Sequence, residues 1–215
     1  MCGGFFYAII YNIYDQTMVT TPEGKTITLN EVTYFLSKCT QEQMKEVLLS
    51  ILKWFKKMGL ANPFNYNYGF EFIQCLTLGY KQTTVGGGSD GIREDGQTTE
   101  LKAAEDKGYT KKGKLKSHSV SYNGTTKKST IEEQKKYCYN KIMRDKFHHW
   151  TIFDYENGKL VMTLKIKNED IWTLIWPKWE KAFYESSTRA DGRINGSLST
   201  NELDRNNIQY EVISH

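Results

Sequence analysis

Residues 88–102 read Gly-Ser-Asp-Gly-Ile-Arg-Glu-Asp-Gly-Gln-Thr-Thr-Glu-Leu-Lys, and the architecture that we expect depends on this stretch. The turn pair Asp95-Gly96 precedes the β-prone pair Thr98-Thr99, which predicts a β-hairpin. If the loop has three residues, with Gly96 in the left-handed position, residue 93 pairs with residue 97. Asp90 then lies opposite Glu100, so two carboxylates face each other across the hairpin.

Strand alternation places Lys102 on the same face as Glu100, whereas a two-residue loop would turn Asp90 to the other face. Two carboxylates and a backbone carbonyl, here that of Leu101, form a hard oxygen site that suits Mg²⁺, with Mn²⁺ as a substitute. Lys102 would orient or deprotonate the attacking water and stabilise the charge on a phosphodiester. We therefore predict Asp90, Glu100 and Lys102 as catalytic residues, and Asp90, Glu100 and Leu101 as the metal ligands.

The Glu-x-Lys pattern is a weak signal by itself, because it also begins at Glu23, Glu105 and Glu133. Of the four, the pattern at Glu100 follows a β-prone pair, and this context selects it. A surface hairpin with solvated charges is the competing interpretation.

The composition of the whole chain limits the classes of function. Its 215 residues can bury one sizeable core, and a net charge of +4 permits an anionic partner such as nucleic acid without requiring one. The four cysteines lie far apart, which disfavours a zinc cluster or a disulfide framework and favours the reducing cytoplasm. The apolar run at residues 5–14 is too short to span a bilayer and lacks a preceding basic residue, so we expect a buried strand or short helix and no membrane partner.

The region 1–66 contains one strong helix signal. Thr40 and Gln43 resemble a capping box, and apolar residues then recur at helical spacing over 41–58. The adjacent residues Trp54 and Phe55 provide more aromatic surface than a single core-facing stripe of the helix requires. We therefore predict that this helix exposes them in a dimer interface, with burial inside one subunit as the simpler alternative.

The region 67–215 is expected to form the catalytic and DNA-recognition core. Apolar residues predict a buried helix over 70–78 that ends at Gly79, and a second helix is expected over 131–143. Residues 150–153 and 159–166 predict another hairpin. The expected fold class is α/β (α+β), with a central mixed β-sheet flanked by helices.

The hairpin at 88–102 resembles the active-site hairpin of PvuII-like type II restriction endonucleases, a family of the PD-(D/E)xK nuclease superfamily. The interval from Asp90 to Glu100 matches, as does Gly96-Gln97 in the turn. A second strong match lies in the Lys-Trp-Glu segment at 178–184, and fainter resemblance brings the coverage to about residues 67–200. The resemblance implies a PD-(D/E)xK core and a homodimer that grips duplex DNA and cuts both strands of a short palindrome with Mg²⁺. It also implies a cognate DNA methyltransferase in the same system.

The resemblance further indicates which residues contact DNA. A family loop rich in Ser and His is matched at 117–123, without the histidine run, and a family Asn-Asn pair appears as Asn195-Gly196. Such side chains can donate and accept at base edges, and lysines can contact phosphates. The predicted DNA-binding residues are Lys114, Lys116, Ser117, His118, Ser119, Ser121, Asn123 and Asn195.

Each of these assignments has a plainer alternative. A lysine run is most often a solvated loop, and the Asn-Gly pairs at 123–124 and 195–196 are most often turns. His148-His149 could suggest a metal site, but adjacent strand residues point in opposite directions, which favours structural or surface roles. For the whole chain, the alternatives are a structure-specific repair or junction-resolving nuclease and a non-catalytic DNA-binding protein.

Overall fold

The computed structural model describes residues 18–20, 23–60, 62–64, 67–83, 88–108, 116–154, 159–185 and 192–214. The chain divides into two compact units, Met1–Tyr68 and Gly69–His215, close to the expected division after residue 66. The apolar run at 5–14 lies outside the described residues. Within the described part, no helix combines the length and the apolar character that crossing a bilayer requires.

The N-terminal unit contains the antiparallel strands β1 (Met18–Thr20) and β2 (Thr26–Thr28), followed by α2 (Leu29–Lys38) and α3 (Gln41–Lys57). Both helices begin with a capping box, in which a threonine and the side chain three residues later satisfy each other's backbone N–H groups. The helix predicted over 41–58 is confirmed.

The predicted exposure of Trp54 and Phe55 is wrong. Their side chains are 8% and 6% exposed, and their rings meet edge to face with centroids 5.3 Å apart. Helical spacing explains this, because Val47, which is also buried, lies seven and eight residues earlier on the same face. The exposed apolar side chains on α2 and α3 are instead Tyr34, Phe35, Leu48 and Leu49.

The C-terminal unit is built on a six-stranded sheet with the order β10-β8-β7-β5-β4-β3. β5 and β7 run parallel and every other neighbouring pair is antiparallel, so the sheet is mixed as expected. The strands are β3 (Lys81–Gln82), β4 (Gly91–Ile92), β5 (Thr98–Glu105), β7 (Phe147–Asp154), β8 (Lys159–Lys167) and β10 (Tyr210–Ser214).

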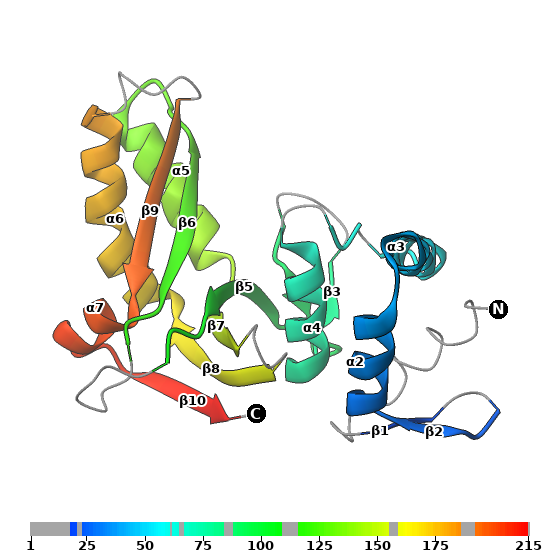
Figure 1. The fold of residues 1–215 in the computed structure, drawn as a ribbon. Coiled ribbons are helices and arrows are strands. Elements are labelled where there is room, and N and C mark those ends of the chain that lie inside the picture. The colour runs from blue at the N-terminus through cyan, green and yellow to red at the C-terminus, as the bar shows by residue number, and fades with distance from the viewer. Residues whose placement is uncertain are drawn as a thin grey trace. The chain divides into compact units, whose positions relative to one another are not determined.

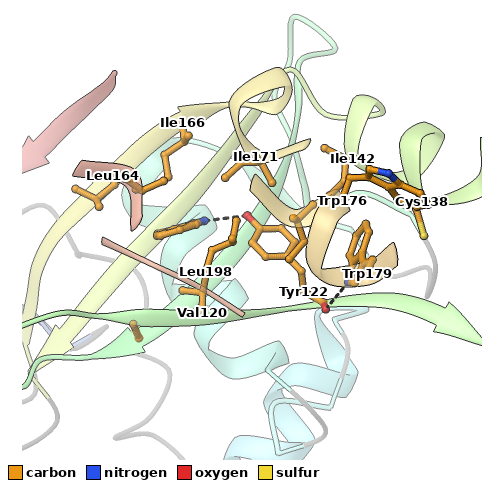
Figure 2. Close-up of a cluster of buried hydrophobic side chains, with 14 of the residues drawn as sticks. Val120, Tyr122, Cys138, Ile142, Leu164, Ile166, Ile171, Trp176, Trp179 and Leu198 are labelled. Atoms are coloured by element: carbon orange, nitrogen blue, oxygen red, sulfur yellow. Dashed lines mark hydrogen bonds between the residues drawn. The ribbon is translucent and has the colours of Figure 1, made fainter. Parts of the chain in front are cut away.

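Helices flank this sheet on both faces. On one face, Cys75 and Leu78 of α4 (Tyr68–Leu78) pack with Leu101 of β5. On the other, α5 (Ile131–Met143) and α6 (Asn168–Glu185) enclose the main core, where Trp150 and Trp179 are fully buried. Figure 2 shows part of this core around Tyr122. The helices predicted over 70–78 and 131–143 and the pairing of β7 with β8 are confirmed, whereas α6, which contains Pro177, was not predicted.

A separate antiparallel ribbon joins β6 (Ser119–Thr126) to β9 (Arg193–Ser199), with Asn123 opposite Asn195 (Figure 1). Both Asn-Gly pairs therefore lie in strands, and their interpretation as turns is wrong. The glycines belong to the inner face that packs on α6. A Cβ on Gly124 would lie 3.0 Å from the Trp179 ring, and a Cβ on Gly196 would lie 2.8 Å from Ile175 Cδ1. The short α7 (Thr200–Arg205) follows β9.

Candidate active site

The three-residue hairpin loop is confirmed. Gly91 pairs with Thr99, and the Arg93 N–H donates to the Gln97 carbonyl at 2.9 Å. Gly96 has φ of 83°, the left-handed conformation that this loop needs, and its N–H donates to the Arg93 carbonyl. The register therefore carries residue 90 opposite residue 100.

Asp90, Glu100 and Lys102 form one hydrogen-bonded network around β5. Asp90 Oδ2 accepts from the Leu101 N–H at 2.7 Å, while Lys102 Nζ donates to Glu100 Oε1 at 2.6 Å and to the Leu101 carbonyl at 3.2 Å. Two of the three predicted metal ligands thus already surround one cation, the Lys102 ammonium. This oxygen donor set fits a small hard cation.

The electrostatics of the site separate the two carboxyl groups. Burial raises the pKa of Asp90, and the Glu100 carboxylate raises it further. Burial also acts to raise the pKa of Glu100, but Lys102, His148 and Lys141 together outweigh it and the pKa is lowered, with Lys102 the largest of the three. Burial disfavours the charge on Lys102, yet Glu100 and Asp90 raise its pKa above the usual value. Lys102 is therefore an ammonium, which suits charge stabilisation better than proton removal.

Glu71 is a third acidic residue of this cluster that the sequence interpretation missed. It lies on α4 and its pKa is raised by burial, while Lys102 and a hydrogen bond with Gln82 act to lower it. Gln74 of the same helix donates from Nε2 to the Lys102 carbonyl at 2.8 Å. The available signal was that Glu71 is the one charged residue in the apolar segment 68–78.

A buried network around Tyr122 lies behind Lys102, whose Nζ is 5.3 Å from the centre of the Tyr122 ring. The Tyr122 hydroxyl accepts from Trp150 Nε1 at 2.9 Å and lies 3.1 Å from His148 Nδ1. The Ile142 carbonyl can only accept, so His148 Nε2 donates to it at 3.2 Å, and Nδ1 of the neutral ring accepts from the Tyr122 hydroxyl. Burial lowers the pKa of His148, so this network holds a neutral imidazole in one tautomer.

The two adjacent histidines point to opposite faces of β7, as alternation predicts. His149 Nδ1 lies 2.7 Å from Thr99 Oγ1, and burial lowers its pKa to about 4. Both rings are buried. Among the residues that the structure describes, no three His, Cys, Asp or Glu side chains gather in an arrangement that could hold a metal ion.

The predicted DNA-binding residues fall into different environments. Those that lie on the exposed outer face of the β6–β9 ribbon are Ser119, Ser121, Asn123 and Asn195. Segments 76 residues apart meet there, because Ser121 Oγ lies 3.4 Å from Ser197 Oγ. This face therefore gathers hydroxyl and amide groups that can donate and accept hydrogen bonds.

The remaining candidates precede the ribbon. Lys116 is exposed, and Ser117 is half-buried with its hydroxyl accepting from the Asn201 N–H. His118 is 1% exposed and its Nε2 lies 3.2 Å from Asp106 Oδ1, so its ring does not face solvent in this conformation. Lys114 lies outside the described residues. Base contact by any of these side chains stays a prediction.

Comparison with protein-family models found no match to this sequence, and comparison with curated proteins found no similar one. The chemistry of the site is therefore the basis on which a function is assigned.

Proposed function

We propose that this chain is a type II restriction endonuclease with a PD-(D/E)xK active site, which hydrolyses phosphodiester bonds in both strands of duplex DNA with Mg²⁺. The observation that carries the proposal is the network of Asp90, Glu100 and Lys102 around one strand, in which the Glu100 carboxylate and the Leu101 carbonyl bind the Lys102 ammonium and Asp90 accepts from the Leu101 N–H. The pKa values of the two buried carboxyl groups are shifted in opposite directions. Groups with such perturbed pKa values are concentrated at functional sites.

Asp90, Glu100 and the Leu101 carbonyl are the residues that would hold the Mg²⁺, or Mn²⁺ in its place. When bound, the ion supplies Lewis-acid neutralisation of the phosphate and lowers the pKa of water. The Lys102 ammonium, 2.6 Å from Glu100 Oε1, favours the ionised form of Glu100. Its ammonium can also donate to the attacking water or to a phosphate oxygen, which stabilises the charge that develops there.

The β6–β9 ribbon supports recognition of DNA sequence over recognition of DNA shape. A two-stranded antiparallel ribbon fits the major groove, where each base pair presents a distinct pattern of donors and acceptors. The outer face of this ribbon presents short polar side chains, with Asn123 and Asn195 directly opposite each other. We propose duplex DNA with a short palindromic site as the substrate, and a cognate DNA methyltransferase as the partner of the system.

The decisive experiment is digestion of a plasmid of known sequence, followed by sequencing of the ends. We expect discrete fragments with Mg²⁺ or Mn²⁺ and none in excess chelator, while Ca²⁺ supports binding with little cleavage because its looser geometry aligns the attack poorly. Nicking limited to branched or damaged DNA would favour the structure-specific nuclease. DNA binding without cleavage in any of these metals would favour the non-catalytic protein.

We predict that Asp90→Ala, Glu100→Ala and Lys102→Ala each lower cleavage at least about 100-fold without unfolding the protein, since the first two remove a group that would hold the metal ion and the third removes a charge that stabilises the reacting phosphate. Single-turnover cleavage and circular dichroism provide the two measurements. Glu105→Ala is the matched control, because Glu105 begins another Glu-x-Lys pattern on the same strand and is exposed. Near-normal cleavage by either carboxylate variant would reject the assignment.

A further inference from the structure

Arg144 lies at the predicted metal-binding carboxylate although it comes from a distant part of the chain. It is the C-cap residue of α5, three residues before β7. Parallel pairing places His148 of β7 opposite Glu100 of β5, so the end of α5 arrives beside Glu100. Arg144 Nη2 then lies 3.1 Å from Glu100 Oε2.

Both oxygens of Glu100 are consequently bonded to cationic side chains. Lys102 Nζ holds Oε1 and Arg144 Nη2 holds Oε2. A metal ion that binds Glu100 through either oxygen must compete with one of these cations. The Arg144 side chain is 28% exposed and that of Lys102 is 17% exposed, so Arg144 is the more accessible of the two to an incoming ligand.

A second contact fixes the base of the guanidinium. Arg144 Nε donates to Asp145 Oδ2 at 3.2 Å. The Asp145 side chain is completely buried, and its Oδ1 has no hydrogen-bond partner in the described part of the chain. A buried carboxylate with so few hydrogen-bond donors is strongly stabilised by the positive charge of Arg144. Because this anchor uses Nε while Glu100 is bound through Nη2, the contact with Glu100 can be exchanged while the anchor stays in place.

We propose that Arg144 is a further catalytic residue, which neutralises Glu100 in the metal-free protein and turns its Nη groups to the scissile phosphate once a metal ion binds Glu100. This inference rests on the proposed nuclease function. In the hydrolysis, the water oxygen bonds to phosphorus, one P–O bond breaks, and the leaving oxygen takes up a proton to form an alcohol beside a phosphate monoester. Arg144 transfers no proton and binds the phosphate oxygens, for which a guanidinium is well shaped.

The test compares Arg144→Gln with wild type in two measurements. In calorimetric titration without DNA, Arg144→Gln should bind Mn²⁺ more tightly, by about threefold or more, because a competing positive charge is gone. In single-turnover cleavage at saturating Mg²⁺, the same variant should be about 10- to 100-fold slower, because a charged hydrogen bond to the phosphate is lost. Arg144→Lys should retain part of the rate. Arg205→Gln, the same charge change on the exposed end of α7, should alter neither quantity.

Asp145 would be left without a cation in Arg144→Gln, so the double variant Arg144→Gln with Asp145→Asn provides a second version that does not bury an unpaired charge. Weaker or unchanged Mn²⁺ binding in a folded variant, or an unchanged cleavage rate, would overturn the inference and leave the nuclease proposal intact. A wild-type protein that binds Mn²⁺ but cuts no duplex DNA would instead remove the nuclease proposal, and this inference with it.

Discussion

Asp90 and Glu100 face each other across one hairpin, yet their surroundings move their pKa values in opposite directions. Lys102 donates directly to Glu100, whereas the neutral Leu101 N–H donates to Asp90. Lys102 and the weaker contributions of His148 and Lys141 together outweigh burial at Glu100, whereas burial and the Glu100 carboxylate raise the pKa of Asp90 to about 8. Two residues of one chemical type thus acquire different protonation states from their environments.

This difference predicts how the stability of the metal-free protein depends on pH. A carboxyl group with a raised folded pKa contributes stability that is complete below its ordinary pKa, about 4, and is lost as pH rises through the raised value. Asp90→Asn removes this loss, so its free energy of unfolding should decline less than that of wild type as pH rises. Urea unfolding in the presence of chelator, repeated across the pH range, measures the free energy of unfolding of wild type and of Asp90→Asn. Glu105→Gln is the control. Parallel profiles for Asp90→Asn and wild type would contradict the raised pKa.

At the scale of elements, the β6–β9 ribbon combines an outer polar face with an inner face that packs closely on α6. Alternation assigns Ser121 and Asn123 to the outer face and Val120 and Tyr122 to the core. Trp179 Nε1 donates to the Tyr122 carbonyl at 3.3 Å (Figure 2), and Gly124 lets the ribbon backbone approach the same indole. The outer face is therefore presented by a rigidly packed support.

Packing against the indole makes Gly124→Ala a test of this support. The new Cβ would lie 3.0 to 3.1 Å from ring atoms of the fully buried Trp179, so we expect a loss of about 1–3 kcal/mol in the free energy of unfolding. Gly196→Ala should cost less, because its nearest neighbour is the end of the Ile175 side chain, which can rotate. Urea unfolding compares the two, and equal stability of wild type and Gly124→Ala would exclude the close packing.

The outer face of the ribbon carries a prediction of its own. Asn195→Ala should weaken binding to the cognate duplex by about 1–3 kcal/mol and leave binding to unrelated DNA unchanged, because an amide contact to a base edge carries sequence information. Lys116→Ala should weaken both to a similar extent, because a phosphate contact carries none. Fluorescence anisotropy in Ca²⁺ measures each duplex. An equal loss on both duplexes in Asn195→Ala would argue against base recognition.

For the whole molecule, the proposed cleavage of both strands of a palindrome leads us to propose a homodimer, because each subunit would carry one active site and a two-fold protein matches a two-fold DNA site. Trp54 and Phe55 are buried and cannot form its interface in this conformation. The N-terminal unit exposes apolar side chains elsewhere on α2 and α3, and the most exposed are Tyr34 and Leu49. These side chains are the candidates for an interface in that unit.

We predict that the protein sediments at twice its monomer mass at micromolar concentration and that Leu49→Glu yields a folded monomer with weak DNA binding. Burying a charge in an apolar interface is unfavourable, which gives the expected direction. Tyr184→Glu, at an exposed aromatic residue near the end of α6, should remain dimeric. A wild-type monomer, with and without DNA, that still breaks both strands at one site would overturn the dimer proposal.

Local signals in the sequence were sufficient for the hairpin and several helices. The Asp95-Gly96 turn, the alternation through Lys102 and the capping box at Thr40 act over a few residues, so their outcome does not depend on the rest of the fold. The meeting of Asp90 with Glu100 is of this kind, because one loop sets the register. Periodicity also indicated α5 without help from its neighbours.

Only the tertiary structure decided which distant segments meet. The ribbon pairs Asn123 with Asn195, and the parallel pairing of β5 with β7 brings Arg144 to Glu100 across 44 residues. Parallel and ribbon pairing join residues that share no local pattern, so packing of the common core selects them. Packing inside the N-terminal unit buries Trp54, and packing inside the C-terminal unit shifts the pKa values of the two facing carboxyl groups in opposite directions. Burial and desolvation arise only when the surrounding chain is in place.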